Sequence, residues 1–254
     1  MMIKEVITTL KKQTKKRYRD MKKLLPTLLI GCLIAFGFTD TQAQDTRFGL
    51  KGGLNFFSIK GEASISFMGF SETETFDSGT QMGFHGGIFM EKPLNEFLSI
   101  QPEINFIQKG GSESDGGVDD FVEFEDEDVT LSYIDVPLLL KINIPLEGNL
   151  SPFITAGGYV GYLLDAKVKF DGTVEDISDD VKDISYGLLF GAGVNFGNFF
   201  VELRYDYGLS NIFDTDLFDE DLNGDFDDDF GFGDIGFDVS IRNRGLSLAV
   251  GIMF

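Results

Sequence analysis

The chain has 254 residues, of which 42 are acidic and 21 are basic, and its formal net charge is −21. So acidic a chain lacks the basic surface that phosphate backbones require, which argues against a nucleic-acid partner. Its single cysteine, Cys32, cannot form an internal disulfide, so no disulfide framework is expected.

Residues 1–43 are predicted to be an export signal peptide. A short basic run from Met21 precedes a 15-residue apolar stretch, and small residues before Gln44 form a cleavage site. The apolar stretch is too short to span a bilayer comfortably. Residues 1–20 are superfluous to such a signal, so either translation begins at Met21 or the basic n-region is unusually long. Cys32 also fits a lipoprotein processing site, although cleavage there would leave an oddly apolar N-terminus.

Removal of the signal peptide makes the remaining chain more acidic. Residues 1–43 hold 9 basic and 3 acidic residues, so residues 44–254 keep 12 basic and 39 acidic residues, a net charge of −27. The removed segment also holds the only cysteine. Residues 44–254 are therefore predicted to form one acidic, cysteine-free domain.

This domain alternates apolar residues with polar or small ones, a period of two that is typical of β-strands with one apolar face. In the first such segment, even positions from Phe48 to Phe56 are mostly apolar, whereas Lys51 and Asn55 occupy odd positions. The pattern occurs in eight segments, near residues 47–57, 81–91, 98–106, 133–143, 154–165, 184–196, 201–207 and 245–254. Bacterial single-chain barrels have an even number of strands. The sequence therefore predicts an all-β fold, an eight-stranded antiparallel transmembrane β-barrel of the up-and-down type.

The connections between these segments alternate in length. The long connections cover about residues 58–79, 110–128, 170–183 and 211–238. The short turns lie near residues 93–95, 147–149 and 197–198. In an outer-membrane barrel the short turns are periplasmic and the long loops are extracellular. Both termini fall on the short-turn side, so both are predicted to be periplasmic.

The last segment ends on Phe254. A soluble strand ending there would leave an apolar face and an open edge, whereas a bilayer accepts the face and barrel closure supplies the neighbour. Phe254 is therefore predicted to be the C-terminal signal for the barrel assembly machinery. A soluble β-sandwich or lipocalin-like barrel would also alternate, but with water-facing residues rich in lysine and glutamate. Here the polar set is mostly glycine, serine, asparagine and isolated charges, which suit a narrow lumen.

The polar positions opposite the apolar faces are predicted to form a charged network inside the barrel. Its members are Lys51, His85, Glu103, Asp135, Lys141, Glu202, Arg204 and Asp206. Charges of both signs in a narrow tube are expected to pair, because an unpaired buried charge is very costly. Such a plug opposes conduction, so a gated pore is the less favoured alternative. His85 is the only histidine and no nucleophile motif is evident, so no enzymatic activity is expected.

Four segments carry a family resemblance, at residues 48–55, 101–104, 133–141 and 152–159. They resemble the PorT-type outer-membrane β-barrel proteins, often labelled the porin family, and the resemblance spans nearly all of residues 46–254. It implies the barrel fold and the outer membrane of a Gram-negative bacterium. The name-giving member serves a protein-secretion machine, so a role beside such a machine is implied as an alternative. The resemblance carries over no catalytic or binding residues.

Negative charge concentrates in the four predicted long loops. Residues 61–79, 110–130, 171–183 and 211–238 contain 30 of the 39 acidic residues of the domain, against a single lysine, Lys182. In the last loop, residues 219–227 match the first nine positions of a calcium-binding loop, with glycine at the sixth position. The candidate calcium ligands are Asp219, Asp221, Asn223, Asp225 and Asp227. Phe230 stands where the bidentate glutamate is expected, so the alternative is a solvated, self-repelling loop.

The sequence thus predicts a non-enzymatic barrel that displays acidic loops for adhesion, cation binding or accessory assembly work. Outer-membrane lipid and the barrel assembly machinery are the expected partners, with divalent cations or surface proteins at the loops. No cofactor other than Ca²⁺ is expected. An accessory barrel of a secretion machine is the first alternative, and a narrow pore is the second.

Overall fold

The computed structural model describes residues 46–67, 70–112, 128–146, 148, 150–170, 173–178, 180–212 and 235–254. The predicted signal peptide, residues 1–43, lies outside the described residues. Within these ranges, no helix is long and apolar enough to cross a membrane.

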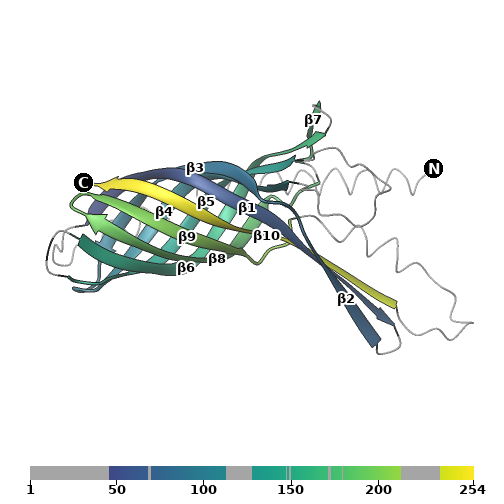
Figure 1. The fold of residues 1–254 in the computed structure, drawn as a ribbon, viewed down its shortest axis with the longest axis horizontal. Coiled ribbons are helices and arrows are strands. Elements are labelled where there is room, and N and C mark those ends of the chain that lie inside the picture. Colours follow the sequence, from purple (N-terminus) through teal and green to yellow (C-terminus); the bar gives the residue numbers. More distant parts are fainter. Residues whose placement is uncertain are drawn as a thin grey trace, which may run out of the picture. The chain divides into compact units, whose positions relative to one another are not determined.

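Eight antiparallel strands form a closed barrel (Figure 1). They are β1 (Arg47–Phe67), β3 (Gln81–Pro93), β4 (Leu98–Ser112), β5 (Asp128–Asn143), β6 (Leu150–Phe170), β8 (Ile184–Phe196), β9 (Phe199–Gly208) and β10 (Ile235–Met253). Each of the eight pairs with the next, and β10 pairs back with β1 in one unbroken register that closes the barrel. The predicted eight-stranded antiparallel fold is confirmed.

The outer wall of the barrel is apolar. On β1, Phe48 and Leu50 are more than half exposed, whereas the alternating Lys51 and Asn55 are buried inside. The same alternation places large apolar side chains outward on all the remaining barrel strands; these side chains are half-buried on β4 and exposed on the others. A soluble barrel would have the opposite arrangement, with its apolar side chains packed in the interior. The soluble alternative is therefore wrong, because the apolar face of each strand points away from the core.

One end of the barrel carries tight connections, and we call it the turn end. Between β3 and β4, the side chain of Asn95 accepts hydrogen bonds from the backbone N–H groups of Phe97 and Leu98, at 2.9 and 2.8 Å. Between β8 and β9 only two residues intervene, and Gly197 has a φ of 63°, a conformation that glycine adopts without a Cβ clash. The start of β1 and the end of β10 lie at this same end, as the pair Gly49↔Met253 shows.

The opposite end, the loop end, has more regular structure than the sequence predicted. Strand β1 continues through the predicted loop 58–79 to Phe67, and there it pairs with β2 (Phe70–Asp77) on one side and with β10 on the other. Figure 1 shows this three-stranded extension leading away from the barrel wall. The predicted end of the first strand at Phe57 is therefore too early.

The reason for the missed extension is a reversal of the alternation. Down to Phe56, the outward positions of β1 are mostly apolar; from Ser58 onward they are Ser58, Lys60, Glu62 and Ser64. Inward positions change in the opposite sense, because Ile59 is buried in an apolar cluster. The strand continues past Phe57, but its outward residues there are polar instead of apolar. The alternation that marks a lipid-facing strand therefore ends before the strand itself ends.

Two further elements lie within predicted loops. Strand β6 extends to Phe170 and pairs with β7 (Thr173–Asp176) inside the predicted loop 170–183. Strand β10 begins at Ile235, inside the predicted loop 211–238. In both places the strands are held by pairing with a neighbour, which a sequence pattern does not report.

Candidate functional site

The candidate site is the barrel lumen, where buried charged residues meet. All eight residues predicted to face the lumen are buried, each less than a tenth exposed. They are Lys51, His85, Glu103, Asp135, Lys141, Glu202, Arg204 and Asp206. The structure does not bring them into one cluster; it distributes them over three layers along the barrel.

The middle layer is an ion-pair network centred on Arg204. Its guanidinium spans two carboxylates: Nη1 and Nη2 contact Glu103 at 2.9 and 3.0 Å, and Nη2 contacts Glu202 at 2.7 Å. Lys51 contacts Glu103 at 2.6 Å and lies 3.8 Å from Glu202. The layer therefore balances two cations against two anions, as burial of charges requires.

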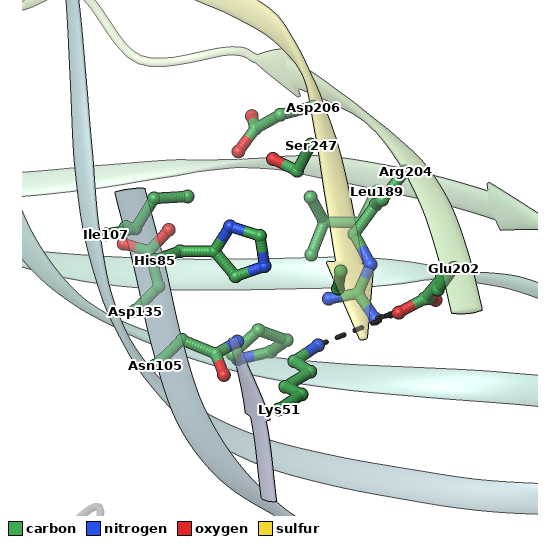
Figure 2. Close-up of a pocket in the computed structure, with 12 residues that line it drawn as sticks. Lys51, His85, Asn105, Ile107, Asp135, Leu189, Glu202, Arg204, Asp206 and Ser247 are labelled. Atoms are coloured by element: carbon green, nitrogen blue, oxygen red, sulfur yellow. Dashed lines mark hydrogen bonds and ion pairs between the residues drawn. The ribbon is translucent and has the colours of Figure 1, made fainter. Parts of the chain in front are cut away.

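This layer crosses the lumen from wall to wall. Arg204 and Glu202 come from β9, whereas Glu103 comes from β4 and Lys51 from β1. Figure 2 shows the Lys51 and Arg204 side chains reaching toward Glu202 from different strands. Small residues leave room for these long side chains. At Gly191 on β8, an added Cβ would meet the Thr155 hydroxyl and lie 2.9 Å from Glu202.

Neutral hydrogen-bond donors complete the coordination of the two carboxylates. Glu103 accepts from the side-chain amides of Gln101, at 2.7 Å, and Asn105, at 2.8 Å. Glu202 accepts from the Thr155 hydroxyl at 2.9 Å. Each carboxylate thus has more than one partner, which fixes the side-chain positions, whereas the buried Nε of Arg204 has no acceptor within the described residues.

The layer toward the loop end is centred on Lys109, which the sequence analysis did not name. Its ammonium group lies 2.9 Å from Asp135 and 3.2 Å from Asp206. It also lies 3.9 Å from the centre of the Tyr159 ring, within cation–π range. Lys109 was missed because the predicted strand ended at residue 106; continuing the alternation to the next odd positions would have found it.

The layer toward the turn end pairs Lys141 with Glu91 at 2.8 Å. The Lys141 ammonium also lies 4.2 Å from the centre of the Phe153 ring. Phe153 packs in an apolar cluster with Phe89, Phe200 and Met253. Glu91 was read as a polar position but not as part of the network, since it lies at the end of the predicted strand.

His85 lies in the lumen beside the middle layer. Its Nδ1 is hydrogen-bonded to the side-chain oxygen of Asn55. Among the described residues, no serine or carboxylate is hydrogen-bonded to the ring. A nucleophile–base pair needs such contact, so the geometry gives His85 a structural setting.

A cavity of about 30 Å³ separates the middle layer from the Lys109 layer, and it is lined by residues that include His85, Asp135 and Ser247 (Figure 2). That space is enough for one or two water molecules. A cavity of about 150 Å³ lies beside Lys109 and is also lined by Gln81, Gln108 and Thr130. Above the Lys109 layer, an apolar cluster fills the loop end; it includes Phe57, Leu131, Tyr133 and Leu163.

The structure describes the predicted assembly signal but not the predicted calcium ligands. Phe254 is described: its backbone N–H donates to the carbonyl of Phe48 at 2.8 Å, and its side chain is 68% exposed. The calcium ligands Asp219, Asp221, Asn223, Asp225 and Asp227 lie outside the described residues. Among the residues that are described, no group of three or more His, Cys, Asp or Glu side chains could hold a metal ion.

Comparison with known proteins places this barrel among outer-membrane domains. The family model described as outer membrane protein beta-barrel domain matches residues 42–214. Among solved structures, OprG from Pseudomonas aeruginosa is similar at 13% identity over 82% of this chain and 95% of that chain, with a TM-score of 0.45. Ail, the attachment invasion locus protein of Yersinia pestis, is similar at 16% identity over 80% and 99%, with a TM-score of 0.32. A search of the curated proteins finds no match.

Proposed function

Because the chain belongs to the family of the outer membrane protein beta-barrel domain, we propose that it is a non-enzymatic, non-conducting scaffold. In this role the barrel is anchored in the outer membrane of a Gram-negative bacterium, and it presents the loop end to a partner outside the cell. The observation that carries the proposal is the filled lumen. Three layers of paired charges and an apolar cluster occupy the path that an ion would take.

The orientation and processing proposed here follow the general rule for such barrels. The turn end, with both ends of the barrel-forming chain, faces the periplasm, and the loop end faces the outside. Residues 1–43 act as the export signal and are removed. Support comes from the tight turns at one end and the extended β1–β2 and β6–β7 hairpins at the other.

The displayed surface is acidic, which limits the partners that fit it. On the β1–β2 hairpin, Glu62, Glu72 and Glu74 are exposed, and Asp77 is paired with Lys60 at 2.6 Å. A basic surface protein or divalent cations would complement this charge. Adhesion or accessory assembly work therefore rests on the loop end rather than on the lumen.

The non-conducting role predicts negligible conductance. Purified protein reconstituted in planar bilayers is expected to give no steady channels in 0.15 M or 1 M KCl, because the ion pairs of the Arg204 layer join opposite walls of the lumen. A large porin prepared in the same way serves as the positive control. Steady, reproducible single-channel steps from the folded protein would favour the narrow-pore alternative instead.

A second candidate function is an accessory barrel of a protein-secretion machine, which the PorT resemblance favours. Deletion of the gene, scored for secreted proteins in the culture medium, tests it. Restored secretion on complementation would support this role, and unchanged secretion would argue for the display role.

We also propose that residues 219–227 hold calcium through Asp219, Asp221, Asn223, Asp225 and Asp227. Calcium at millimolar or lower concentration in 0.15 M salt is then expected to protect residues 211–238 from proteolysis, whereas magnesium protects them poorly. The variant Asp221→Ala should abolish the difference between the two ions. Equal protection by both ions in the parent would leave only diffuse screening of an acidic loop.

A further inference from the structure

Two arginines on the outer face of the barrel, Arg242 and Arg244, stand where the apolar belt ends. The last apolar row on this side joins Phe56, Leu246 and Tyr205 as cross-strand neighbours on β1, β10 and β9. Arg244 lies in the next outward row, opposite Tyr207 on β9. Two residues along a strand advance by about 7 Å, so Arg244 is held at the depth of lipid headgroups.

Both side chains face outward. On β10 the residues that alternate with them, Asn243 and Gly245, are buried, and the next outward position, Leu246, is exposed. The pairing of β10 with β1 continues through this region without a register shift, so the alternation holds.

Neither arginine has a carboxylate partner among the described residues, although the chain has an excess of acid. Of the other described cations on the outer face near the loop end, Lys60 pairs with Asp77 at 2.6 Å and Lys167 pairs with Asp165 at 2.8 Å, whereas Lys169 has no ion pair within the described residues. Within their own side chains, the Nε atoms of Arg242 and Arg244 are buried and lack a hydrogen-bond acceptor.

The immediate surroundings orient these donors but do not neutralise them. Arg244 stacks on the Tyr207 ring at 4.5 Å and donates to its hydroxyl at 3.2 Å. Arg242 stands directly opposite Lys60 in the β1–β10 register, an adjacent pair of like charges that is unfavourable. Asp77 faces Lys60 from β2 and balances one of these two charges, and Glu62 lies one row farther from the apolar belt.

We propose that Arg242 and Arg244 bind the phosphate of an anionic membrane lipid at the loop-end boundary of the barrel. Arginine presents several N–H groups in a plane and matches phosphate oxygens in a bidentate way. The phosphate accepts hydrogen bonds from the guanidinium Nη groups, because the Nε atoms are buried, and it offsets the two positive charges. The acyl chains of the lipid lie along the apolar belt of the barrel, a contact that a free phosphate ion cannot make. This proposal requires only that the barrel lies in a membrane. It does not depend on whether the barrel conducts ions or binds a partner at its loops.

The test measures lipid binding by the full protein, purified and folded in a non-ionic detergent, with native mass spectrometry. The probe is phosphatidylglycerol, with zwitterionic phosphatidylcholine as the comparison. The parent is expected to bind phosphatidylglycerol about 20-fold more tightly at low ionic strength, since each basic residue near an anionic headgroup contributes about fivefold. Equal binding of the two lipids by the parent would overturn the proposal without any variant.

Matched variants then assign the effect to the two arginines. The double variant Arg242→Gln/Arg244→Gln is expected to lose most of the preference, whereas Lys167→Gln, which removes a cation already paired on the same outer face, should change it less than twofold. Heat-modifiable gel migration reports that each variant is folded. A loss of equal size in Lys167→Gln would show a diffuse charge effect and overturn the site. Competition by inorganic phosphate at the same concentration as the lipid would likewise overturn it, in favour of a small-anion site.

Discussion

Replacing Arg204 by alanine is expected to destabilise the folded barrel by an amount on the order of 3 kcal/mol, the cost of leaving buried charges without a partner. The Arg204 guanidinium contacts both Glu103 and Glu202, and both carboxylates are almost fully buried. The measurement is the midpoint of urea unfolding in detergent micelles, followed by circular dichroism. Lys60→Ala is the matched control, because its ion pair with Asp77 is about half exposed and such pairs contribute less than about 1 kcal/mol.

A rescue experiment separates lost pairing from lost packing. If an unpaired carboxylate causes the destabilisation, the double variant Arg204→Ala/Glu202→Gln should recover part of it, since Lys51 then stays paired with Glu103 and the layer is neutral again. An unchanged midpoint in Arg204→Ala would contradict the plug described above. A double variant no more stable than Arg204→Ala would instead attribute the loss to the missing volume of the arginine side chain.

Deleting Phe254 is expected to leave export intact and to reduce the folded barrel in the outer membrane severalfold. The Phe254 side chain is largely exposed, and its backbone N–H donates to the carbonyl of Phe48. Its loss should therefore cost the finished barrel little, so a defect would lie in recognition during assembly. Heat-modifiable migration of membrane extracts measures the folded fraction.

Two comparisons sharpen this result. Phe254→Ala keeps the backbone hydrogen bond and should behave like the deletion, whereas Phe254→Tyr keeps the aromatic ring and should assemble normally. Refolding of the purified deletion variant into detergent micelles should proceed as in the parent. If the deletion variant assembles in cells at the level of the parent, Phe254 is not an assembly signal.

The fold was accessible from the sequence because a membrane barrel imposes one simple pattern. Each strand meets lipid on one side and a narrow lumen on the other, so a period of two marks both the strand and the direction of its side chains. Phe48 and Lys51 could be assigned to opposite faces on this basis, and the structure places them there. The boundaries failed where the lipid ends, as at Ser58, because strand pairing continues without the pattern.

The sequence could not predict which charged side chains pair with one another in the lumen. Alternation shows that Arg204 faces inward, but not that its guanidinium reaches Glu103 on the far wall rather than Asp206 on its own strand. That choice depends on the stagger between non-adjacent strands, which is a property of the closed barrel. Lys109 was missed because it lies beyond the predicted strand end at residue 106, and Glu91 was left out of the network because it is the last residue of its predicted strand.

The reversal of alternation at Ser58 also determines the bilayer thickness that suits this barrel. The outward apolar positions run from Phe48 to Phe56 on β1 and from Met82 to Met90 on β3. Eight steps along a strand measure about 26 Å, or about 20 Å along the membrane normal at a tilt near 40°. A bilayer with a thicker hydrocarbon core would have to thin around this side of the wall or cover polar rows with acyl chains. The barrel should consequently insert faster into vesicles of short-chain lipids than into those of long-chain lipids, and in a mixed membrane it should gather the shorter lipids around β1 and β3.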